Sequence, residues 1–395
     1  MIPSWVANEL AQLQEANALR ALRVVEGPVG PVLRVEGRDV FCFSSNDYLG
    51  FASDPRLANA AGDAARQLGT GAGSSRLITG TLALHTTLEQ ELAAFKGAQS
   101  ALLFGTGYQA NVGVLQGLMR EGVIFSDVLN HASIVDGCRL ARASVQVYAH
   151  ADMGHLERLL RAHQTAPRKL VVTDGVFSMD GDLAPLDSIA ELAEAHGALV
   201  LVDDAHATGV LGGGHGTGRH FGLDTSTLIQ MGTLGKALGS FGAFVACAKP
   251  VRDLLLNRAR SFVYTTAPPP AVLAASMAAL RLLRDEPQLV AQLAANAALL
   301  RNGLREAGFA VTTDPTPIVP VVLGDNARAL RWAARLWELG FWVQAIRPPT
   351  VPPGSARLRI TVSAAHHAQQ IESLCQALAD LAASEREKGQ HESHA

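Results

Sequence analysis

The segment that decides the fold is residues 199–236, which reads LVLVDDAHATGVLGGGHGTGRHFGLDTSTLIQMGTLGK. Two apolar runs within it, residues 199–202 and 228–231, have the length and composition of buried strands. Polar side chains follow the two runs directly: Asp203, Asp204 and His206 after the first, Thr233 and Lys236 after the second. Because ligands bind at the carboxyl ends of strands in open parallel sheets, the segment predicts one crevice that gathers these side chains.

A carboxylate, an imidazole, a hydroxyl and an amine in one crevice suit pyridoxal 5'-phosphate (PLP). Asp203 ends a buried strand and needs a cation, and a protonated pyridine nitrogen is one. Lys236 would form the Schiff base, since an apolar, glycine-rich setting lowers the pKa of an amine. His206 would donate to the phenolic oxygen of the ring, and Asp204 is interpreted as a helix N-cap. Taken alone, a lysine at a strand end such as Lys236 is usually a solvated charge, and His206 can be interpreted as a structural loop residue.

Three further stretches place polar groups at the same sheet edge. Thr106, Gly107 and Tyr108 lie where a predicted strand meets a helix, and backbone N–H groups there favour phosphate. His131, in LNHASI, can stack on an aromatic cofactor, although a histidine that begins a helix is also interpreted as a cap. Ser178, in DGVFSMDGD, ends another strand. The predicted site rests on the convergence of these strand ends.

Other sequence patterns are ambiguous or argue against particular classes of site. The stretch GTGAGSSRLITG at residues 69–80 suits an anion cradle or, alternatively, a mobile surface loop, and it matches neither phosphate-binding fingerprint. The pieces HESHA and GGGHGTGRH lack the spacing of a metalloprotease or zinc site, so we expect no metal. A dinucleotide-binding oxidoreductase is disfavoured because no GxGxxG occurs.

Composition bounds the class of protein. The 33 basic and 36 acidic residues give a net charge of −3, which disfavours a nucleic-acid partner. The nearly apolar residues 271–280 make up about half of the ~18 residues that a membrane helix needs. No basic residue precedes Arg20, so no secretory signal is expected. Four widely spaced cysteines indicate buried free thiols, and a soluble cytoplasmic protein without a membrane partner is predicted.

Strands and helices alternate between residues 101 and 247, which predicts right-handed βαβ units and an α/β fold with a mostly parallel sheet. We expect four parts along the chain. They are an N-terminal arm (1–45) with a helix over 1–23 and a hairpin, a large PLP-binding domain (46–285), a smaller C-terminal α+β domain (286–384) and a disordered tail (385–395).

Together these segments resemble the fold-type I PLP-dependent enzymes and, among them, the α-oxoamine synthases. The resemblance covers residues 18–380. It rests on the segments SSNDYLG, GTGAGSSR, LNHASI, DGVFSMDGDLAPL, VDDAHATG, GTLGKALG and AIRPPTVPPGSARLRITVSAAH. It implies a large domain whose mostly parallel sheet is flanked by helices, a smaller C-terminal α+β domain, and a homodimer with the active site at the interface. One departure is Ala207, where the family often has glycine.

The resemblance also implies residue roles. Lys236, His131 and Asp203 are the catalytic residues: Lys236 holds PLP and removes the α-proton, His131 stacks on the ring and Asp203 holds the pyridinium. The implied cofactor-binding residues are Thr106, Gly107, Tyr108, His131, Ser178, Asp203, His206, Thr233, Lys236 and, reaching across to the partner's cofactor, Thr266. The implied substrate-binding residues are Arg20, Asn46, Ser75, His131, Thr350 and Arg359, with Asn46 and Arg359 on the amino-acid carboxylate.

The segments IRPPTVP and ARLR, with Ser75, resemble the branch that condenses L-alanine with a pimeloyl thioester and releases CO2 in biotin biosynthesis. The far carboxylate of the pimeloyl chain would meet Arg20 or Arg347. The acyl carrier is either CoA or a carrier protein. The alternatives are sister synthases that use glycine, namely glycine C-acetyltransferase and 5-aminolevulinate synthase. A non-catalytic subunit of the same fold is disfavoured, because it would not need Lys236.

Overall fold

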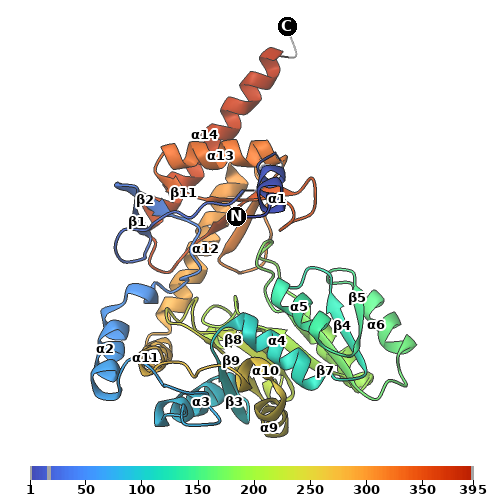
Figure 1. Ribbon diagram of the computed structural model, residues 1–395. Helices are drawn as coiled ribbons and strands as arrows, with labels where there is room; N and C mark the ends of the chain where they lie inside the picture. The colour runs from blue at the N-terminus through green and yellow to red at the C-terminus, as the bar shows by residue number, and fades with distance from the viewer. Residues whose placement is uncertain (1, 16–18, 393–395) are drawn as a thin grey trace.

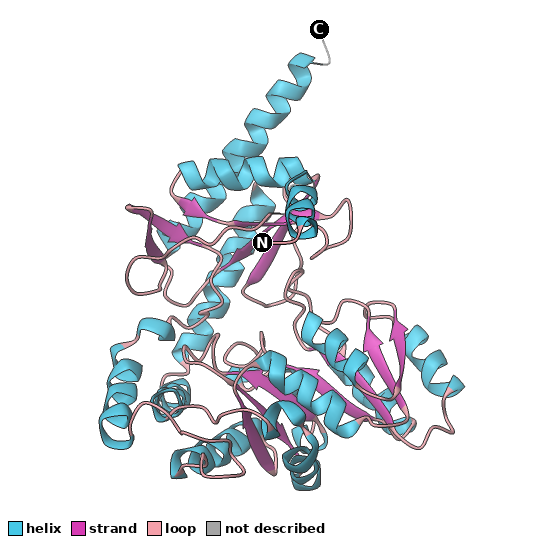
Figure 2. Ribbon diagram, in the orientation of Figure 1, coloured by secondary structure: helices cyan, strands magenta, loops and turns pink. Residues whose placement is uncertain are grey.

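The computed structural model describes residues 2–15 and 19–392 and divides them between a large and a small unit (Figures 1 and 2). A seven-stranded sheet forms the centre of the large unit, in the order β3-β9-β8-β7-β6-β4-β5. Its strands are β3 (Ser100–Phe104), β4 (Val123–Asp127), β5 (Ser144–Tyr148), β6 (Lys169–Asp174), β7 (Leu199–Asp203), β8 (Ile229–Thr233) and β9 (Ala243–Cys247). Only β9 runs antiparallel to its neighbours, so the predicted mostly parallel sheet is confirmed.

Strand β7 shows why the apolar run at residues 199–202 forms a central strand. Successive side chains of a strand point to opposite faces. Leu201 therefore packs into the core on one side of the sheet, and Val200 and Val202 pack into the core on the other side. Burial on both faces is what removes the polar alternation from the sequence of this strand.

Helices cover both faces of the sheet. The helices on the side of Leu201 are α4 (Gly107–Leu118), α5 (Ala132–Leu140), α9 (Lys249–Arg258) and α10 (Arg260–Val263). Those on the opposite side are α6 (Met153–Ala162) and α7 (Leu186–Ala195). A further apolar cluster joins α2 (Pro55–Leu68), α3 (Ala83–Lys96) and α11 (Pro270–Asp285). The short helices are α8 (Thr217–His220), η1 (Phe51–Ser53), η2 (Gly212–Gly214) and η3 (Thr225–Thr227).

The small unit is built on an antiparallel sheet of order β10-β13-β12 with its own apolar core. Its elements are α12 (Gln288–Glu306), β10 (Ile318–Gly324), α13 (Asn326–Glu338), β11 (Phe341–Trp342), β12 (Gln344–Ile346), β13 (Ala356–Thr361) and α14 (Ala368–Glu392). In Figure 1 this unit lies above the large sheet, and α14 projects beyond it. The connection from α11 to α12 is where we propose the domain boundary.

The N-terminal arm differs from the expectation of a separate part. Strands β1 (Val32–Val35) and β2 (Arg38–Cys42) form the predicted hairpin, but β2 also pairs with β11 of the small unit. Helix α1 (Ser4–Glu15) ends well before residue 23 and buries none of its residues. Residues 19–23 are not helical, and 16–18 lie outside the described residues.

The expectation of a disordered tail is wrong for residues 385–392. Helix α14 continues to Glu392, because the segment is rich in alanine, glutamate, lysine and arginine, which favour a helix even without an apolar face. Residues 393–395 lie outside the described part of the chain. Within residues 2–15 and 19–392, no helix has both the length and the apolar character needed to cross a membrane.

Candidate active site

A cavity of about 190 Å³ lies at the carboxyl ends of β6, β7 and β8 and at the N-terminal ends of α4 and α5. The predicted site residues that line it are Gly107, Tyr108, His131, Ser178, Asp203, His206, Thr233 and Lys236. The other lining residues are Ser133, Asp174, Val176, Ala205 and Met231. The sheet edge therefore gathers the side chains that were expected there from the order of strands alone.

Asp203 is buried, and neutral donors hold its carboxylate. Asn111 Nδ2 lies 2.7 Å from Oδ2, and the amide nitrogen of Ala205 lies 2.9 Å from Oδ1. Burial raises the pKa of Asp203, while the nearby charge of Lys236 opposes the rise. In the next strand, Asp174 is paired with Asp203 in register, and burial together with the charge of Asp203 raises its pKa further. Two buried carboxylates side by side need a positive charge in the cavity.

Lys236 faces this cavity next to a buried histidine. Its Nζ lies 2.8 Å from Nε2 of His206, and Nδ1 of His206 lies 2.6 Å from the hydroxyl of Tyr48. Burial lowers the pKa of Lys236 to about 8, although Asp203 and Asp174 pull it upward. Burial and the charge of Lys236 lower the pKa of His206 well below its usual range, so its ring is neutral. An amine with this pKa is substantially neutral and nucleophilic in mildly alkaline solution.

Asp204 has a different environment from Asp203, and it is not the N-cap residue of a helix, although the first amide of α8 donates to it. No helix follows it directly. Its fully buried carboxylate instead accepts from Lys96 Nζ at 2.7 Å and from the hydroxyl of Thr217 at 2.6 Å. The amide nitrogen of Thr217, which begins α8, also donates to it at 3.2 Å. Asp204 therefore joins the end of α3 to the start of α8, and it does not line the cavity.

Two of the predicted residues are helix caps. His131 Nδ1 accepts from the amide of Ser133 at 3.2 Å at the start of α5, and its imidazole also lines the cavity. The Thr106 hydroxyl accepts from the amide of Gln109 at 3.1 Å at the start of α4. With Thr106 as the cap, the first amides of α4, those of Gly107 and Tyr108, have no partner within the helix and suit an anion.

A second pocket, of about 560 Å³, adjoins the first, and both are lined by His131, Ser178, His206 and Lys236. It adds the predicted pair Asn46 and Arg359. Arg359 donates through Nη2 to Asn46 Oδ1 at 3.2 Å and through Nε to the carbonyl of Ser178 at 2.5 Å. Apolar side chains form other parts of its wall: Val25, Leu33, Trp342 and Ile346. A cationic clamp beside apolar walls suits a carboxylate at one end of the pocket and an acyl chain along it.

Several predicted residues line neither pocket. Thr106 is a cap, and Arg20 and Thr350 are exposed. The Thr350 amide donates to the carbonyl of Arg347 at 3.0 Å. Ser75 and Thr266 are brought together, but as a β-bridge with each other. Substrate or cofactor contacts of these residues remain predictions.

Sequence reasoning missed three residues of this site: Asn111, Asp174 and Tyr48. Asp174 could have been found, because it ends a strand at the same edge as Asp203. Asn111 lies one helical turn after Gly107, on the face of α4 that meets the sheet, but nothing local connects it to Asp203. Tyr48 reaches His206 across 158 residues of sequence, and no local signal reports that contact.

The donor set of the cavity fits PLP. Two adjacent buried carboxylates need a cation, which a protonated pyridine nitrogen supplies, and the free amides at the start of α4 suit a phosphate. Lys236 lines the same cavity and provides an amine with a lowered pKa. Within residues 2–15 and 19–392, no cluster of three or more histidine, cysteine, aspartate or glutamate side chains could hold a metal ion.

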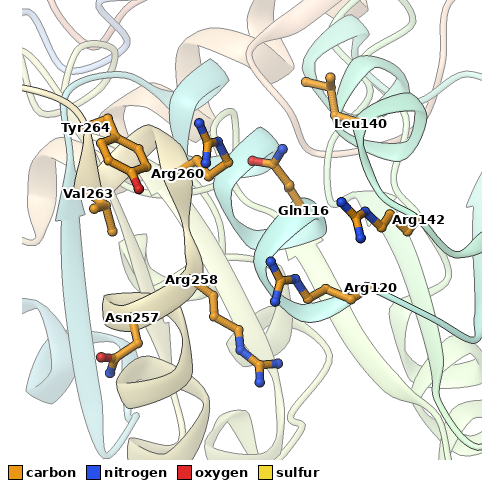
Figure 3. Close-up of a pocket in the computed structure, with 9 residues that line it drawn as sticks. All are labelled: Gln116, Arg120, Leu140, Arg142, Asn257, Arg258, Arg260, Val263 and Tyr264. Carbon is orange, nitrogen blue, oxygen red and sulfur yellow. The ribbon is translucent and has the colours of Figure 1, made fainter.

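Another pocket lies elsewhere and contains none of the predicted site residues. It measures about 630 Å³ and is lined by four exposed arginines, Arg120, Arg142, Arg258 and Arg260 (Figure 3). Arg260 lies over the ring of Tyr264 at 4.7 Å, and Tyr264 is 72% exposed. Because its charges are exposed and of one sign, this pocket lacks the buried acid and base groups from which catalytic sites are built.

The fold and the site together define a fold-type I PLP-dependent enzyme. The aminotransferase class I and II family model matches residues 38–378. The 8-amino-7-oxononanoate synthase of Geobacter sulfurreducens is 52% identical over 381 residues, which cover 95% of this chain and 97% of the relative. The chain therefore belongs to the aminotransferase class I and II family, in the branch of the 8-amino-7-oxononanoate synthases.

Solved structures agree with this placement. A serine palmitoyltransferase from S. paucimobilis, solved with a bound PLP–myriocin adduct, superposes with a TM-score of 0.89 at 31% identity and covers 95% of this chain and 96% of its own. The 8-amino-7-oxononanoate synthase of Francisella tularensis superposes with a TM-score of 0.77 at 28% identity, and 88% of this chain matches 99% of that one.

Proposed function

We propose that this chain uses PLP to condense L-alanine with a pimeloyl thioester, giving 8-amino-7-oxononanoate, CO2 and a free thiol in biotin biosynthesis. The observation that carries the proposal is the pair of adjoining pockets. One contains Lys236 and the buried carboxylates, and the other contains the Arg359–Asn46 pair and apolar walls. The relatives at about 50% identity supply the particular reaction.

Each residue has a task in this proposal. Arg359 and Asn46 bind the carboxylate of alanine and so orient its Cα–H bond toward Lys236. Lys236 Nζ would hold the cofactor until the amino group of alanine displaces it, and the freed amine, whose pKa is lowered to about 8, would then accept the α-proton. Asp203 presents its negative charge to the cavity, where it would pair with the protonated pyridine nitrogen of PLP. When bound, PLP supplies the electron sink that stabilises negative charge at Cα.

The acyl chain occupies the larger pocket. Val25, Leu33, Trp342 and Ile346 give it apolar walls, and the chain ends in a carboxylate that needs a cationic contact. Arg20 and Arg347 are the candidates for that contact. The thioester carbonyl lies toward His131, which lines both pockets. Attack by Cα expels the thiol, and loss of CO2 from the condensed product follows.

Serine palmitoyltransferases superpose more closely than the oxononanoate synthase of Francisella tularensis, with TM-scores up to 0.91 against 0.77. Sequence identity favours the opposite assignment, at 52% against 32%. Steady-state kinetics with alanine, glycine and serine against pimeloyl-, acetyl-, succinyl- and palmitoyl-CoA decide between them. Alanine should be preferred over glycine by about 1–3 kcal/mol, the value of one methyl group in a pocket. A preference for glycine, or for serine with palmitoyl-CoA, would overturn the proposal.

We further propose that the enzyme is a homodimer, in which Thr266 reaches the partner subunit's cofactor. The support is the exposed strip beside the Ser75–Thr266 bridge, where Ile78 is 75% exposed and Tyr264 is 72% exposed. Apolar patches of this kind are usually covered by a partner. Sedimentation that finds a fully active monomer would contradict this proposal. The four buried free thiols support a cytoplasmic location.

A further inference from the structure

The loop that carries Ser178, residues 177–182, is held almost residue by residue. From the small unit, Arg359 donates to the carbonyl of Ser178, Arg357 contacts the Met179 carbonyl and the Asp180 carboxylate, and Thr316 donates to the carbonyl of Gly181. Ser178 lines both site pockets, and its carbonyl fixes the Nε side of the Arg359 guanidinium. The position of this loop therefore sets the orientation of the proposed carboxylate clamp.

From the large unit, the loop is held by His150, which follows β5. Its Nε2 lies 2.7 Å from Oδ2 of Asp182, and its Nδ1 lies 3.1 Å from Oδ1 of Asp127 at the end of β4. The ring also meets the ring of Phe177 edge-on, with centroids 4.4 Å apart. Asp127 is itself fixed, because its second oxygen accepts from the amide of Ala151 at 3.0 Å. His150 thus ties the loop to the edge of the sheet.

Both contacts need the protonated ring. A neutral imidazole has one N–H donor, and only the imidazolium donates through both nitrogens. Hydrogen bonds to Asp127 and Asp182 raise the pKa of His150 to about 10, against the opposing effect of burial. The remaining oxygen of Asp182, Oδ1, is buried and has no hydrogen-bond partner among the described residues. The side chain of Asp182 is therefore held by His150 alone in this part of the structure.

We propose that His150 is a positioning residue for this reaction: by joining Asp127 to Asp182 it holds residues 177–182 so that Ser178 faces the cofactor cavity and Arg359 faces the amino acid. His150 lines neither site pocket, so it acts through the loop and touches no reactant. The identity of the amino acid in this inference depends on the function proposed above. The link between His150 and the loop does not depend on it.

The first test compares His150→Gln with His163→Gln. His163 is a matched control, because its ring also packs near a phenylalanine, Phe125 at 6.0 Å, but forms no ion pair or hydrogen bond with a carboxylate among the described residues. We expect His150→Gln to raise the KM for alanine about 10- to 100-fold, the effect of a small misplacement of a binding group. The absorption maximum of bound PLP should shift as Ser178 moves, while the control keeps wild-type values.

A second test separates positioning from stability. His150→Ala leaves two carboxylates facing each other, and adding Asp182→Asn removes one of those charges. We expect the double variant to regain much of the melting temperature while the KM for alanine stays raised. If KM recovers together with the melting temperature, or if His150→Gln lowers only the melting temperature, the role is merely structural and the proposal is wrong.

A third measurement is independent of turnover. In protein prepared without PLP, amide hydrogen exchange in residues 177–182 should be faster in His150→Gln than in the wild type and in His163→Gln. Unchanged exchange there would overturn the proposal. A wild-type enzyme that fails to use alanine would instead overturn the proposed function, and the exchange result would still report on His150.

Discussion

Two lysine–aspartate clusters lie in neighbouring regions of the large unit, and they differ in whether the charges meet. At the end of α3, Lys96 and Asp204 are both fully buried, and they pair at 2.7 Å. At the sheet edge, Lys236 has no ion-pair partner among the described residues, and Asp203 is held by the neutral donors Asn111 and Ala205. In the closed pair, Lys96 and Asp204 neutralise each other's charge. The separated pair leaves one amine and one carboxylate to act on a ligand, which is why the second cluster is the reactive one.

The largest effect is expected from a substitution in the separated pair, Lys236 and Asp203. Lys236→Ala should lower kcat by about 10⁴-fold, because it removes the group that holds the cofactor and accepts the α-proton. Borohydride should no longer attach PLP to the chain. The melting temperature of the protein without PLP should change little, since the side chain of Lys236 makes one hydrogen bond, with His206, among the described residues. A Lys236→Ala protein that borohydride still labels with PLP would refute this assignment.

A substitution in the closed pair, Lys96 and Asp204, should lower the stability of the protein and not its activity. Lys96→Met leaves the Asp204 carboxylate buried with hydroxyl and amide donors only, and should cost about 3–5 kcal/mol of unfolding free energy. Urea denaturation measures this loss. The double variant Lys96→Met/Asp204→Asn is the control and should recover part of the stability, because no unpaired charge remains. A loss below about 1 kcal/mol would mean that the pair is not structural.

Replacing Asp203 and Asp204 by asparagine, one at a time, tests the difference between the two pairs directly. Asp203→Asn should keep the fold but lower kcat/KM by about 10²- to 10³-fold, since a neutral amide does not hold a pyridinium charge. Asp204→Asn should lower the melting temperature and leave the KM for alanine close to the wild-type value. Near-normal turnover in Asp203→Asn would show that the essential carboxylate lies elsewhere, with Asp174 as the next candidate.

The smallest effect concerns pH. The pKa of Lys236 is lowered to about 8, so the amine is neutral above that pH and charged below it. In protein without PLP, labelling of Lys236 by an amine reagent should therefore slow by about tenfold per pH unit below pH 8. Lys96 is the internal control and should stay unlabelled while the protein is folded, because its side chain is fully buried. A labelling midpoint near pH 10 would contradict the lowered pKa.

Much of the fold followed from local sequence. Residues 199–202 were predicted as a buried strand, and β7 spans Leu199–Asp203, because an apolar run that ends in charged residues is a short-range signal. Helix α2 begins at Pro55 and ends at Leu68 because a proline starts it and a glycine follows it, and both are local signals. The tail and the N-terminal helix were predicted less well, because helix length there depends on propensity and packing rather than on a boundary residue.

The sequence by itself determined which chemical groups reach the sheet edge, since that follows from where each strand stops. It also placed Asp203 and Asp204 together at the end of one buried strand. Only the tertiary structure decided which of the two is reactive. Lys96, 108 residues before Asp204, neutralises that carboxylate, whereas Asn111, 92 residues before Asp203, leaves its partner charged and facing the cavity. The physical reason is that a carboxylate's role depends on the partners that burial brings to it, and these partners come from distant parts of the chain.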